Sequence, residues 1–428
     1  MKSNSRLPRA ATWARAILLL ACAVAPGAAA CAPRGASLRP SPHAVALAVA
    51  DSLRRILDQA VADSAFPGAY AVVGNSAGVL AEYGAGQLDW APSPAPTEHT
   101  LWDLASLTKV VGMTTAVMQL VEGGRVELDA PVQRYLPEWT GPNQERVTVR
   151  HLLTHSAGLP AWRPLYKEAL DAEGALALAV TTPLDTVPGA RMLYSDVGAI
   201  LLGQIVERVS GERLDALLAR TVFEPLGMRE TGYRPTPLLA LRAAPTEFDP
   251  WRQRHLRGEV HDENAYMLGG VSSHAGLFGT ARDLTRFARM LLGGGALEGT
   301  RIVRRATLDE FTRVQDPALS HRALGWETAN GVNSAGRRMS ARAFGHTGFT
   351  GTSLWVDPER DTFVLLLTNR VNRTRENRKI GGVRVALADA VMAALGAPAR
   401  FSPTPAAVAP AATAPAAPAA PPSTPPRP

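Results

Sequence analysis

The sequence predicts a mixed α/β (α+β) fold, in which one antiparallel sheet is assembled from both ends of the chain, with flanking helices and an inserted helical subdomain. Two β-rich runs, residues 69–74 and 79–84, lie near the start, and two more, 353–357 and 362–368, lie near the other end. The region from about 100 to 310 is mostly helical in pattern, with long loops. Strands at both ends of a helical middle imply this architecture.

The elements at the two ends each carry a local signal. Residues 43–65 place apolar side chains at helical spacing, and residues 381–395 form a second amphipathic helix that closes the fold. Residues 75–78 (Asn-Ser-Ala-Gly) join the first two strands as a hairpin turn, and residues 358–361 (Pro-Glu-Arg-Asp) join the last two. Together these signals predict a globular domain over residues 43–398.

Both termini differ in composition from this domain. Residues 1–30 have a basic start, an apolar stretch at 16–24 and three alanines at 28–30, which is typical of an export signal with a small-residue cleavage site. Residues 31–42 are interpreted as a linker, and residues 399–428, rich in Ala and Pro, as a disordered tail. We therefore expect the mature protein in the periplasm or anchored in the cell envelope.

The composition excludes several classes of protein. With 46% hydrophobic and 19% charged residues over 428 positions, the chain is neither wholly disordered nor a polytopic membrane protein. Four basic residues and no acidic residue fall in the leader, so the net charge of +7 drops by four, to +3, when the leader is removed. Lys and Arg form no run longer than two residues, and we expect no nucleic-acid partner.

The two cysteines, Cys22 and Cys31, lie in or beside the leader. The globular part therefore has no thiol nucleophile, no internal disulfide and no Cys-ligated metal site. Cys31 follows small residues, as the lipid acceptor of bacterial lipoproteins does, whereas Cys22 fits the residue types of that pattern better but leaves only a short apolar core before it. Either cysteine could carry a membrane anchor, or both could be incidental residues of the signal.

The first catalytic candidate is the Ser-x-x-Lys sequence at Ser106 and Lys109, which opens an apolar-periodic segment ending at Gly123 and Gly124. This i, i+3 spacing predicts a helix with the Ser hydroxyl and the Lys amine on one face. A serine hydroxyl needs an adjacent base, and a lysine desolvated in a dry cleft can be neutral enough to serve. The alternative is a helical first turn with an exposed lysine.

Two further motifs carry polar groups. Tyr194 and Asp196 lie on a loop before a predicted helix at 197–209, where the tyrosine could relay a proton and the carboxylate could either hold a lysine or simply cap the helix. His346-Thr347-Gly348 lies at a predicted strand edge, where Gly348 allows another backbone to approach closely and the edge can accept an extended substrate. Alone, such a triplet is more often an ordinary turn.

In this order, Ser-x-x-Lys, Tyr-x-Asp and His-Thr-Gly resemble the motifs of the penicillin-recognising serine hydrolases. Residues 148–159 (Thr-Val-Arg-His-Leu-Leu-Thr-His-Ser-Ala-Gly-Leu) and 345–352 are similar to signatures of the class C β-lactamase-like branch. That branch includes β-lactamases, low-molecular-mass D-alanyl peptidases, which are penicillin-binding proteins, and certain carboxylesterases. The resemblance extends from about residue 45 to 395 and implies a β-lactamase/transpeptidase-like fold.

The resemblance also implies roles for individual residues. Ser106 would be the acyl-forming nucleophile, Lys109 its base and Tyr194 the proton relay. The backbone N–H groups of Ser106 and Phe349 would form the oxyanion hole. The family implies neither a cofactor nor a metal, and substrate binding would fall to Asp196, His346, Thr347 and Gly348.

Two positions depart from the β-lactamase pattern: Asp196 stands where Asn is usual, and His346 where Lys is usual. A lysine would anchor the carboxylate of a β-lactam, whereas a histidine is mostly neutral near pH 7. The sequence therefore favours an exported hydrolase of an ester or a cell-wall D-amino-acid peptide over a β-lactamase. A non-catalytic envelope penicillin-binding protein is a third alternative, against which the presence of both Ser106 and Lys109 argues.

Other features are weaker. Residues 74–78 match Gly-x-Ser-x-Gly, but they join two strands rather than a strand and a helix, so we reject them as a nucleophile elbow. His255, His261 and His274 lack the close spacing of metal ligands. Residues 261–279 are polar and Gly-rich, and they either line the substrate cleft or cap a helix and bury hydrogen bonds in a long loop.

Overall fold

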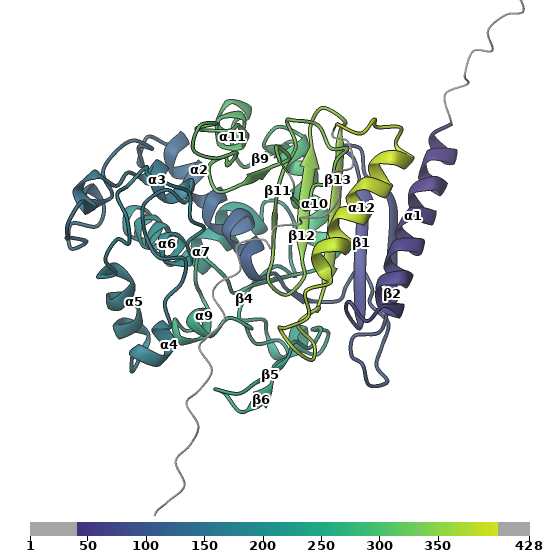
Figure 1. Cartoon of the computed structure of the whole chain (residues 1–428), viewed down its shortest axis with the longest axis horizontal. Helices are drawn as coiled ribbons and strands as arrows, with labels where there is room; N and C mark the ends of the chain where they lie inside the picture. Colours follow the sequence, from purple (N-terminus) through teal and green to yellow (C-terminus); the bar gives the residue numbers. More distant parts are fainter. Residues whose placement is uncertain (1–40, 332, 401–428) are drawn as a thin grey trace, which may run out of the picture. The chain divides into compact units, whose positions relative to one another are not determined.

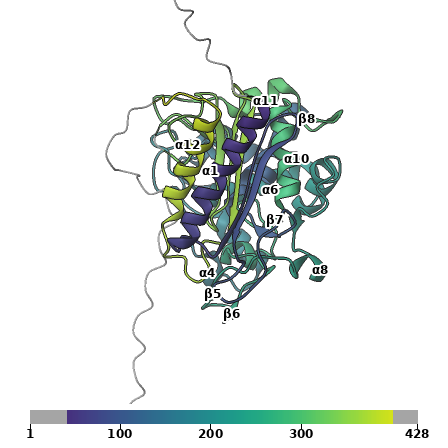
Figure 2. The ribbon, with the colours of Figure 1, turned by 90° about the vertical axis from the view of Figure 1, so that its right-hand side faces the viewer.

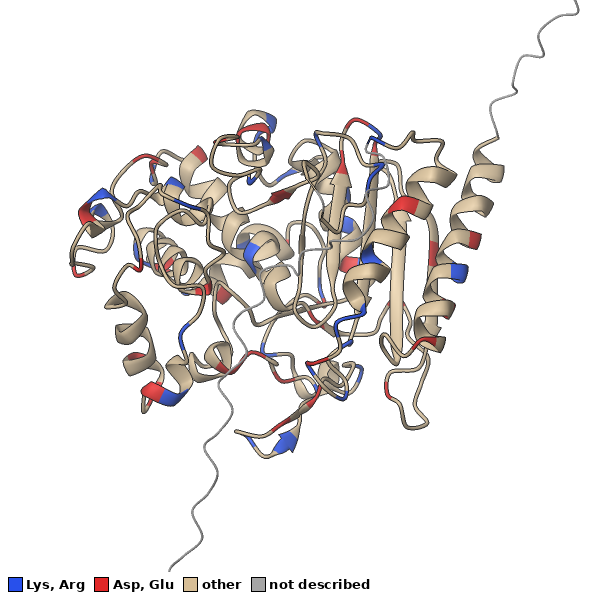
Figure 3. Ribbon diagram, in the orientation of Figure 1, with Lys and Arg blue, Asp and Glu red and all other residues tan. Residues whose placement is uncertain are grey.

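The computed structural model describes residues 41–331 and 333–400. The predicted export signal, Cys31 and the tail from residue 401 onward lie outside the described residues. Within the described ranges, no helix combines the length and the hydropathy that a membrane span requires. Lys and Arg positions are interspersed with Asp and Glu positions over this part of the chain (Figure 3).

The fold is organised around a six-stranded antiparallel sheet with the order β10-β11-β12-β13-β1-β2 (Figure 1). Strands from the two ends of the chain meet in its middle, where Ala69 of β1 pairs with Thr368 of β13. The predicted sheet is therefore confirmed, and the four predicted strands match within two residues. The six strands are β1 (Gly68–Gly74), β2 (Val79–Gly86), β10 (Glu327–Thr328), β11 (Phe344–Thr347), β12 (Ser353–Asp357) and β13 (Thr362–Thr368).

Helices cover both faces of this sheet. Helices α1 (Pro42–Ala62) and α12 (Ile380–Ala394) lie side by side on one face, and α10 (Ala281–Leu292) lies on the other (Figure 2). Successive side chains of a strand point to opposite faces. Val73 of β1 accordingly packs in the core with α1 and α12, whereas Val72 packs in the core of the helical region. Burial on both faces explains why β1 and β13 are continuous apolar runs.

The hairpin between β1 and β2 closes as predicted. Asn75 N donates to Gly78 O (2.8 Å), and Ser76 bonds the side chain of Asp361 in the neighbouring turn. Ser76 therefore holds two turns together, which agrees with the rejection of residues 74–78 as a nucleophile elbow.

The region between β2 and β10 is the predicted helical insert, with short strands that pair locally. Its longest helices are α6 (Asp196–Ser210) and α10. The remaining elements are β3 (Trp102–Asp103), η3 (Val132–Arg134), η4 (Gln144–Arg146), α3 (Val149–Leu153), α4 (Leu165–Glu168), α5 (Ala172–Val180), α7 (Leu214–Leu218), η5 (Ala219–Phe223), β4 (Gly232–Tyr233), α8 (Pro237–Ala240), β5 (Phe248–Asp249), β6 (Arg254–His255), α9 (Glu263–Met267), β7 (Leu277–Gly279), β8 (Ala296–Leu297), β9 (Thr300–Arg301) and α11 (Arg305–Thr312).

The segment that begins at Ser106 differs from the predicted single helix. Ala105 has a φ of +46°, and Thr115 Oγ1 donates to the carbonyl of Val110, five residues earlier (2.9 Å). Strained and π-helical backbone of this kind gathers at functional sites. The predicted end of the segment at Gly123 is confirmed, but the chain reaches it through a 3₁₀ turn η1 (Ala105–Leu107), a π-helical stretch η2 (Lys109–Thr114) and the helix α2 (Thr115–Glu122).

Candidate active site

Ser106 is the middle residue of the tight turn η1, and its side chain is partly exposed. Asp103 fixes this turn, because its carboxylate accepts hydrogen bonds from Ala105 N (2.8 Å) and from His261 N (2.7 Å). Asp103 is fully enclosed, and burial raises the pKa of its carboxyl despite these bonds. Asp103 therefore both stabilises the turn that carries Ser106 and connects it to the loop after residue 260.

Lys109 lies beneath Ser106, with only 1% of its surface exposed. Its Nζ is 3.0 Å from Ser106 Oγ, so the predicted pairing of these two side chains is present. The same nitrogen donates to the His274 carbonyl (2.8 Å) and lies 2.7 Å from Asp196 Oδ1. Three oxygens therefore surround the amine and fix its direction toward Ser106.

The charge on Lys109 differs from the sequence-based expectation. Burial by itself lowers the pKa of this amine, but the carboxylate of Asp196 outweighs burial and raises the pKa above its usual value. The expectation of a lysine kept neutral by desolvation is therefore wrong, because the pKa shift has the opposite direction. The position where β-lactamases of the branch usually have Asn carries the negative charge that holds the proton on Lys109.

Asp196 is free to pair with Lys109 because another residue caps its helix. Ser195 Oγ accepts a hydrogen bond from Gly198 N (3.1 Å), which makes Ser195 the N-cap of α6 and Asp196 its first residue. The alternative that Asp196 merely caps the helix is therefore wrong. Ser195 Oγ also donates to the Pro160 carbonyl (2.6 Å), which holds the start of α6 against the preceding loop.

Tyr194 lies among charged and aromatic groups. The Lys109 Nζ is 5.0 Å and the Arg322 Cζ is 5.2 Å from the centroid of its ring, and the His155 and His346 rings lie at 4.5 and 5.8 Å. Its buried hydroxyl makes no hydrogen bond of good geometry with any described residue, but it lies near enough to the Lys109 amine and the Ser106 hydroxyl to interact with both. Burial raises the pKa of Tyr194 and the neighbouring Lys109 offsets this only in part, so the phenol keeps its proton at neutral pH.

The 148–159 segment positions Tyr194. His155 Nδ1 accepts a hydrogen bond from Ser195 N (3.1 Å), and the His155 carbonyl accepts one from Leu193 N (2.8 Å), so the two bonds bracket Tyr194. Thr148 caps the short helix α3 that leads into this segment. Burial, followed by the charges of Arg322 and Lys109, lowers the pKa of His155 well below its usual value, and a neutral ring accepts the Ser195 bond.

His346 and Thr347 end strand β11, beyond the two residues of β11 that pair with β10. His346 Nδ1 lies 2.8 Å from the Thr347 carbonyl, while its buried Nε2 has no partner among the described residues. Burial and then Arg322 and Lys109 lower the pKa of His346 well below its usual value. Burial and the two cations therefore favour the neutral imidazole that the sequence analysis expects at this position.

The turn at 348–352 is tied to the turn of Ser106. A Cβ on Gly348 would lie 2.5 Å from the Leu104 carbonyl oxygen, which confirms the close backbone approach expected there. Thr350 Oγ1 donates to the Asp103 carbonyl (2.8 Å), and Thr352 Oγ1 donates to the Leu104 carbonyl (3.0 Å). These contacts bring Phe349 close to Ser106.

The 261–279 loop acts through hydrogen bonds. Asp262 accepts from Ala265 N (2.8 Å) as the N-cap of α9, and it also lies 2.9 Å from His274 Nε2. His274 Nδ1 is 2.7 Å from Ser272 Oγ, and the carbonyl of His274 receives the Lys109 amine. Of the two alternatives for this loop, the structure shows helix capping with buried hydrogen bonds. The loop also orients Lys109, which the sequence did not indicate.

Arg322 is the residue at the site that sequence reasoning missed. Its guanidinium lies over the Tyr194 ring, its side chain is 11% exposed, and it pairs with Glu327 at 3.3 Å. Its Nη1 is buried without a hydrogen-bond partner among the described residues. Arg322 belongs to no motif and is one of 41 arginines, so no sequence signal could have singled it out.

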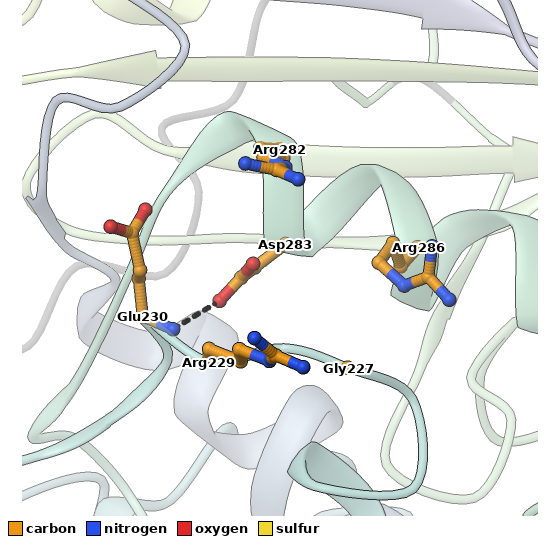
Figure 4. A pocket seen from close by; sticks show the side chains of 6 residues that line it. All are labelled: Gly227, Arg229, Glu230, Arg282, Asp283 and Arg286. Atoms are coloured by element: carbon orange, nitrogen blue, oxygen red, sulfur yellow. Dashed lines mark hydrogen bonds between the residues drawn. The ribbon is translucent and has the colours of Figure 1, made fainter.

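A cavity of about 440 Å³ lies elsewhere, between the loop after η5 and the first turns of α10 (Figure 4). Arg229, Arg282 and Arg286 line it, and Asp283 accepts a hydrogen bond from Glu230 N (2.7 Å). None of the sequence-predicted site residues lines this cavity. Within the described ranges, no group of three or more His, Cys, Asp or Glu side chains is arranged to hold a metal ion.

A serine on a turn at the end of an antiparallel sheet, with a buried lysine one turn away and a Tyr-x-Asp loop above it, defines a serine hydrolase of the penicillin-recognising type. The family model described as Beta-lactamase matches residues 53–388, and the chain belongs to this family. The resemblance seen in the sequence motifs is thereby confirmed.

Known proteins with different names are similar to this chain in sequence or in fold. A protein of Salmonella agona (strain SL483) named "Putative D-alanyl-D-alanine carboxypeptidase" is 30% identical over 315 residues, which cover 66% of this chain and 72% of the relative. A penicillin-binding protein homologue from Caulobacter crescentus (TM-score 0.67, 21% identity) covers 83% of this chain and 98% of its own. EstCE1, a hydrolase with promiscuous acyltransferase activity (TM-score 0.66, 24% identity), covers 81% and 99%. The two structures show the shared fold.

Proposed function

We propose that this serine hydrolase forms an acyl-enzyme on Ser106 and that its acyl donor is a D-amino-acid peptide with a free carboxylate, as in a D,D-carboxypeptidase. The observation that carries the proposal is the placement of the Lys109 amine, 3.0 Å from Ser106 Oγ and 2.7 Å from Asp196. A serine hydroxyl becomes a competent nucleophile when an oriented base lies within hydrogen-bond reach. The name of the Salmonella relative supports the choice of substrate class.

In the proposed reaction, Ser106 Oγ bonds to the carbonyl carbon while its proton passes to the neutral form of Lys109. The oxygen that gains negative charge is held by the N–H groups of Ser106 and Phe349, neither of which has another hydrogen-bond partner among the described residues. The C–N bond then breaks, and the leaving amine takes the proton of the Tyr194 hydroxyl, which regains a proton from Lys109. Water releases the acyl group and restores the Ser106 hydroxyl.

A free carboxylate on the substrate is favoured by the charge at Arg322. His346 is neutral and its Nδ1–H donates to the Thr347 carbonyl, so its unpartnered Nε2 can accept a hydrogen bond but offers a carboxylate neither a proton nor a charge. Arg322 adds a permanent cation beside it, with one buried nitrogen free to donate. Charge-assisted hydrogen bonds are roughly twice as strong as neutral ones, and guanidinium suits a carboxylate. The cation that the sequence lacks at position 346 is therefore supplied from position 322.

Intact-mass spectrometry tests the acyl-enzyme. We expect incubation with a small p-nitrophenyl ester, and separately with a penicillin, to add the mass of one acyl group to the wild type and none to Ser106→Ala. Turnover by Ser106→Ala or Lys109→Ala should fall below a tenth of that of the wild type with the fold intact by circular dichroism. A Ser106→Ala variant that keeps more than a tenth of the activity would contradict the assignment.

The same experiment separates the alternatives. A peptide ending in D-alanyl-D-alanine that loses its last residue supports the carboxypeptidase, whereas rapid turnover of the penicillin adduct would identify a β-lactamase. The Arg322 cation can hold the carboxylate of either substrate, so acylation by a penicillin alone does not decide between them. If no acyl donor forms an adduct, the remaining alternative is a non-catalytic binding protein.

The carboxylate selection has a separate test. Arg322→Gln should lower kcat/KM for the D-alanyl peptide about tenfold or more, because truncating one member of a buried charged contact typically costs at least 1–3 kcal/mol. The neutral p-nitrophenyl ester should lose much less. Arg313→Gln is the matched control, since Arg313 is exposed and pairs with Glu310. Equal losses for the charged and neutral acyl donors would show that Arg322 does not recognise a carboxylate.

We also propose that the chain is exported, on the basis of the composition of residues 1–30. Cell fractionation and the mass of the mature N-terminus test this proposal. A mature chain that begins at Cys31 with the added mass of acyl groups would mark a lipoprotein of the cell envelope. An unmodified N-terminus near residue 31 would mark ordinary signal cleavage, and a chain that retains residues 1–30 would contradict export.

A further inference from the structure

Arg384 of α12 holds the turn that carries Phe349. Its Nη2 donates to the carbonyl oxygens of Gly348 and Thr352, both at 2.7 Å. The side chain is 8% exposed, and its Nε has no partner among the described residues. No carboxylate within the described ranges lies at ion-pairing distance from this guanidinium.

An unpaired cation in this place is costly for stability. Burial and then the neighbouring Arg370 lower the pKa of Arg384 to about 9, while Glu327 opposes the shift. Moving a charge from water into a protein interior costs several kcal/mol unless it is paired or fully hydrogen-bonded. Anchoring a turn does not require a charged group, because a neutral amide could donate to the same carbonyls. The charge therefore calls for a second explanation.

The carbonyl of Gly348 and the N–H of Phe349 belong to one peptide group. A hydrogen bond to the oxygen of an amide draws electron density toward that oxygen and strengthens the N–H as a donor, because hydrogen bonds in a chain polarise one another. A cationic donor has the larger effect. In this turn the cation bonds the oxygen end of the peptide whose N–H is the proposed second donor to the oxyanion.

We propose that Arg384 is a positioning residue that strengthens the oxyanion hole by polarising the Gly348–Phe349 peptide. This inference rests on the proposed acyl-enzyme at Ser106. Arg384 acts through the Phe349 N–H and touches no reacting atom. Its charge stabilises the tetrahedral oxyanion more than the neutral substrate carbonyl, and it therefore contributes to the rate rather than to substrate binding.

Arg370 supplies a comparison within the same turn. Its Nε donates to the Phe349 carbonyl (2.7 Å), and its guanidinium lies 4.4 Å from the centre of the Phe349 ring. It too is buried, and burial lowers its pKa to about 10. The Phe349 carbonyl belongs to the next peptide group, so Arg370 anchors the turn without bonding the peptide that donates to the oxyanion.

The test compares Arg384→Gln, Arg370→Gln and Arg257→Gln. Arg257 also donates to two backbone carbonyls, those of Leu241 and Ala243, but in another loop. The readouts are kcat and KM for a p-nitrophenyl ester, the affinity of a boronic acid that forms a tetrahedral adduct with Ser106, and the melting temperature.

For Arg384→Gln we expect kcat and the boronic-acid affinity to fall together by about tenfold, with KM unchanged. This loss is smaller than the 10²–10³-fold typical of removing an oxyanion donor outright, since the Phe349 N–H remains. Arg370→Gln should lower the melting temperature with a smaller loss of boronic-acid affinity, and Arg257→Gln should leave kinetics unchanged. An Arg384→Gln variant that melts earlier but keeps kcat and boronic-acid affinity would overturn the inference.

Arg384→Lys keeps the test decisive if the glutamine variant does not fold. A lysine retains the charge and one donor, and in the same buried setting it loses its proton at a lower pH than arginine does. The charged groups that act on this position are Arg370 and Glu327. The boronic-acid affinity of Arg384→Lys, relative to that of the wild type at each pH, should therefore decline as pH rises. A constant ratio would overturn the inference, and a wild type without any Ser106 adduct would overturn the proposed function as well.

Discussion

Lys109 is subject to two opposing influences on its proton. Burial favours the neutral amine, and the Asp196 carboxylate at 2.7 Å favours the ammonium ion. The second influence is larger, so the resting site holds an ion pair beside Ser106. Because only the neutral amine can take the Ser106 proton, the proposed acylation should speed up as pH rises above neutrality.

Asp196→Asn should shift this pH dependence. Without the carboxylate, burial dominates and the pKa of Lys109 falls, so the rising limb of kcat/KM against pH should move to lower pH. At neutral pH the variant should then acylate faster than the wild type. The measurement is kcat/KM for a neutral p-nitrophenyl ester between pH 5 and 10.

Asp129→Asn provides the matched control, because Asp129 also pairs with a cation, Arg150, but lies on an exposed surface. Its pH profile should match that of the wild type. If the rise of kcat/KM with pH instead moved to higher pH in Asp196→Asn, Asp196 would be the final acceptor of the Ser106 proton.

Single residues also mark where sequence reasoning ends. Ser106, Lys109, Tyr194 and His346 could be proposed as site residues because each belongs to a short motif with a chemical reason for its spacing. Arg322 could not, because its relevance comes only from folding, which brings it to 5.2 Å from the Tyr194 ring. The sign of the Lys109 pKa shift was also beyond the sequence, since it depends on how close the Asp196 carboxylate lies to the amine, and only the fold determines that distance.

At the level of elements, the pattern of the chain predicts the sheet well and the nucleophile segment poorly. Strands β1, β2, β12 and β13 are short apolar or alternating runs between clear turn signals, so local sequence defines their ends. The segment after Ala105 has good helical periodicity, yet it contains a 3₁₀ turn and a π-helical stretch. Contacts with distant residues impose that geometry, among them the bond from His261 N to the Asp103 carboxylate, which also accepts from Ala105 N.

The turn between β11 and β12 gives a prediction at this scale. In Gly348→Ala, the new Cβ would meet Thr352 Oγ1 at 2.0 Å and the Leu104 carbonyl oxygen at 2.5 Å. The turn must then move away from Ser106, which separates the two N–H groups of the proposed oxyanion hole. We expect kcat/KM to fall by about 10²–10³-fold, as for loss of an oxyanion donor, with a destabilisation of about 1–3 kcal/mol.

Gly78→Ala is the control for this substitution, because Gly78 also lies in a turn between two strands, but a Cβ added there would meet no atom within 4 Å. Its kinetics and stability should stay close to those of the wild type. Esterase assays and urea unfolding measure both effects. A Gly348→Ala enzyme with wild-type kcat/KM would show that the approach of the two turns is not needed for turnover.

Across the whole described domain, the topology assembles the site from distant parts of the chain. Ser106 and Lys109 follow the first hairpin, Asp196 starts a helix of the insert, and His346 lies on a strand from the other end. Pairing of β1 with β13 joins residues almost 300 positions apart, as in the Ala69–Thr368 pair, and it closes the site. A site built in this way depends on the stability of the whole fold, so conditions that unfold the domain also abolish activity.

The domain should lose stability in mildly acidic solution. His155 and His346 are buried, and their pKa values are well below the usual value of about 6.5. Below that pH the unfolded chain binds protons at both positions while the folded chain does not, so protonation favours unfolding. Each histidine can change the free energy of unfolding by up to about 1.4 kcal/mol per pH unit. This contribution to stability is fully present above about pH 6.5 and is lost progressively as pH falls below it.

Urea unfolding of the wild type and of His155→Gln at intervals from pH 5 to 8 measures this slope. Glutamine does not titrate, and its carbonyl oxygen can accept the Ser195 N–H bond, so the variant should lose less stability than the wild type as pH falls from 6.5 to 5. His255→Gln is the control because His255 is exposed, and its slope should equal that of the wild type. If His155→Gln instead showed the full wild-type slope, the acid sensitivity would have to arise from other groups.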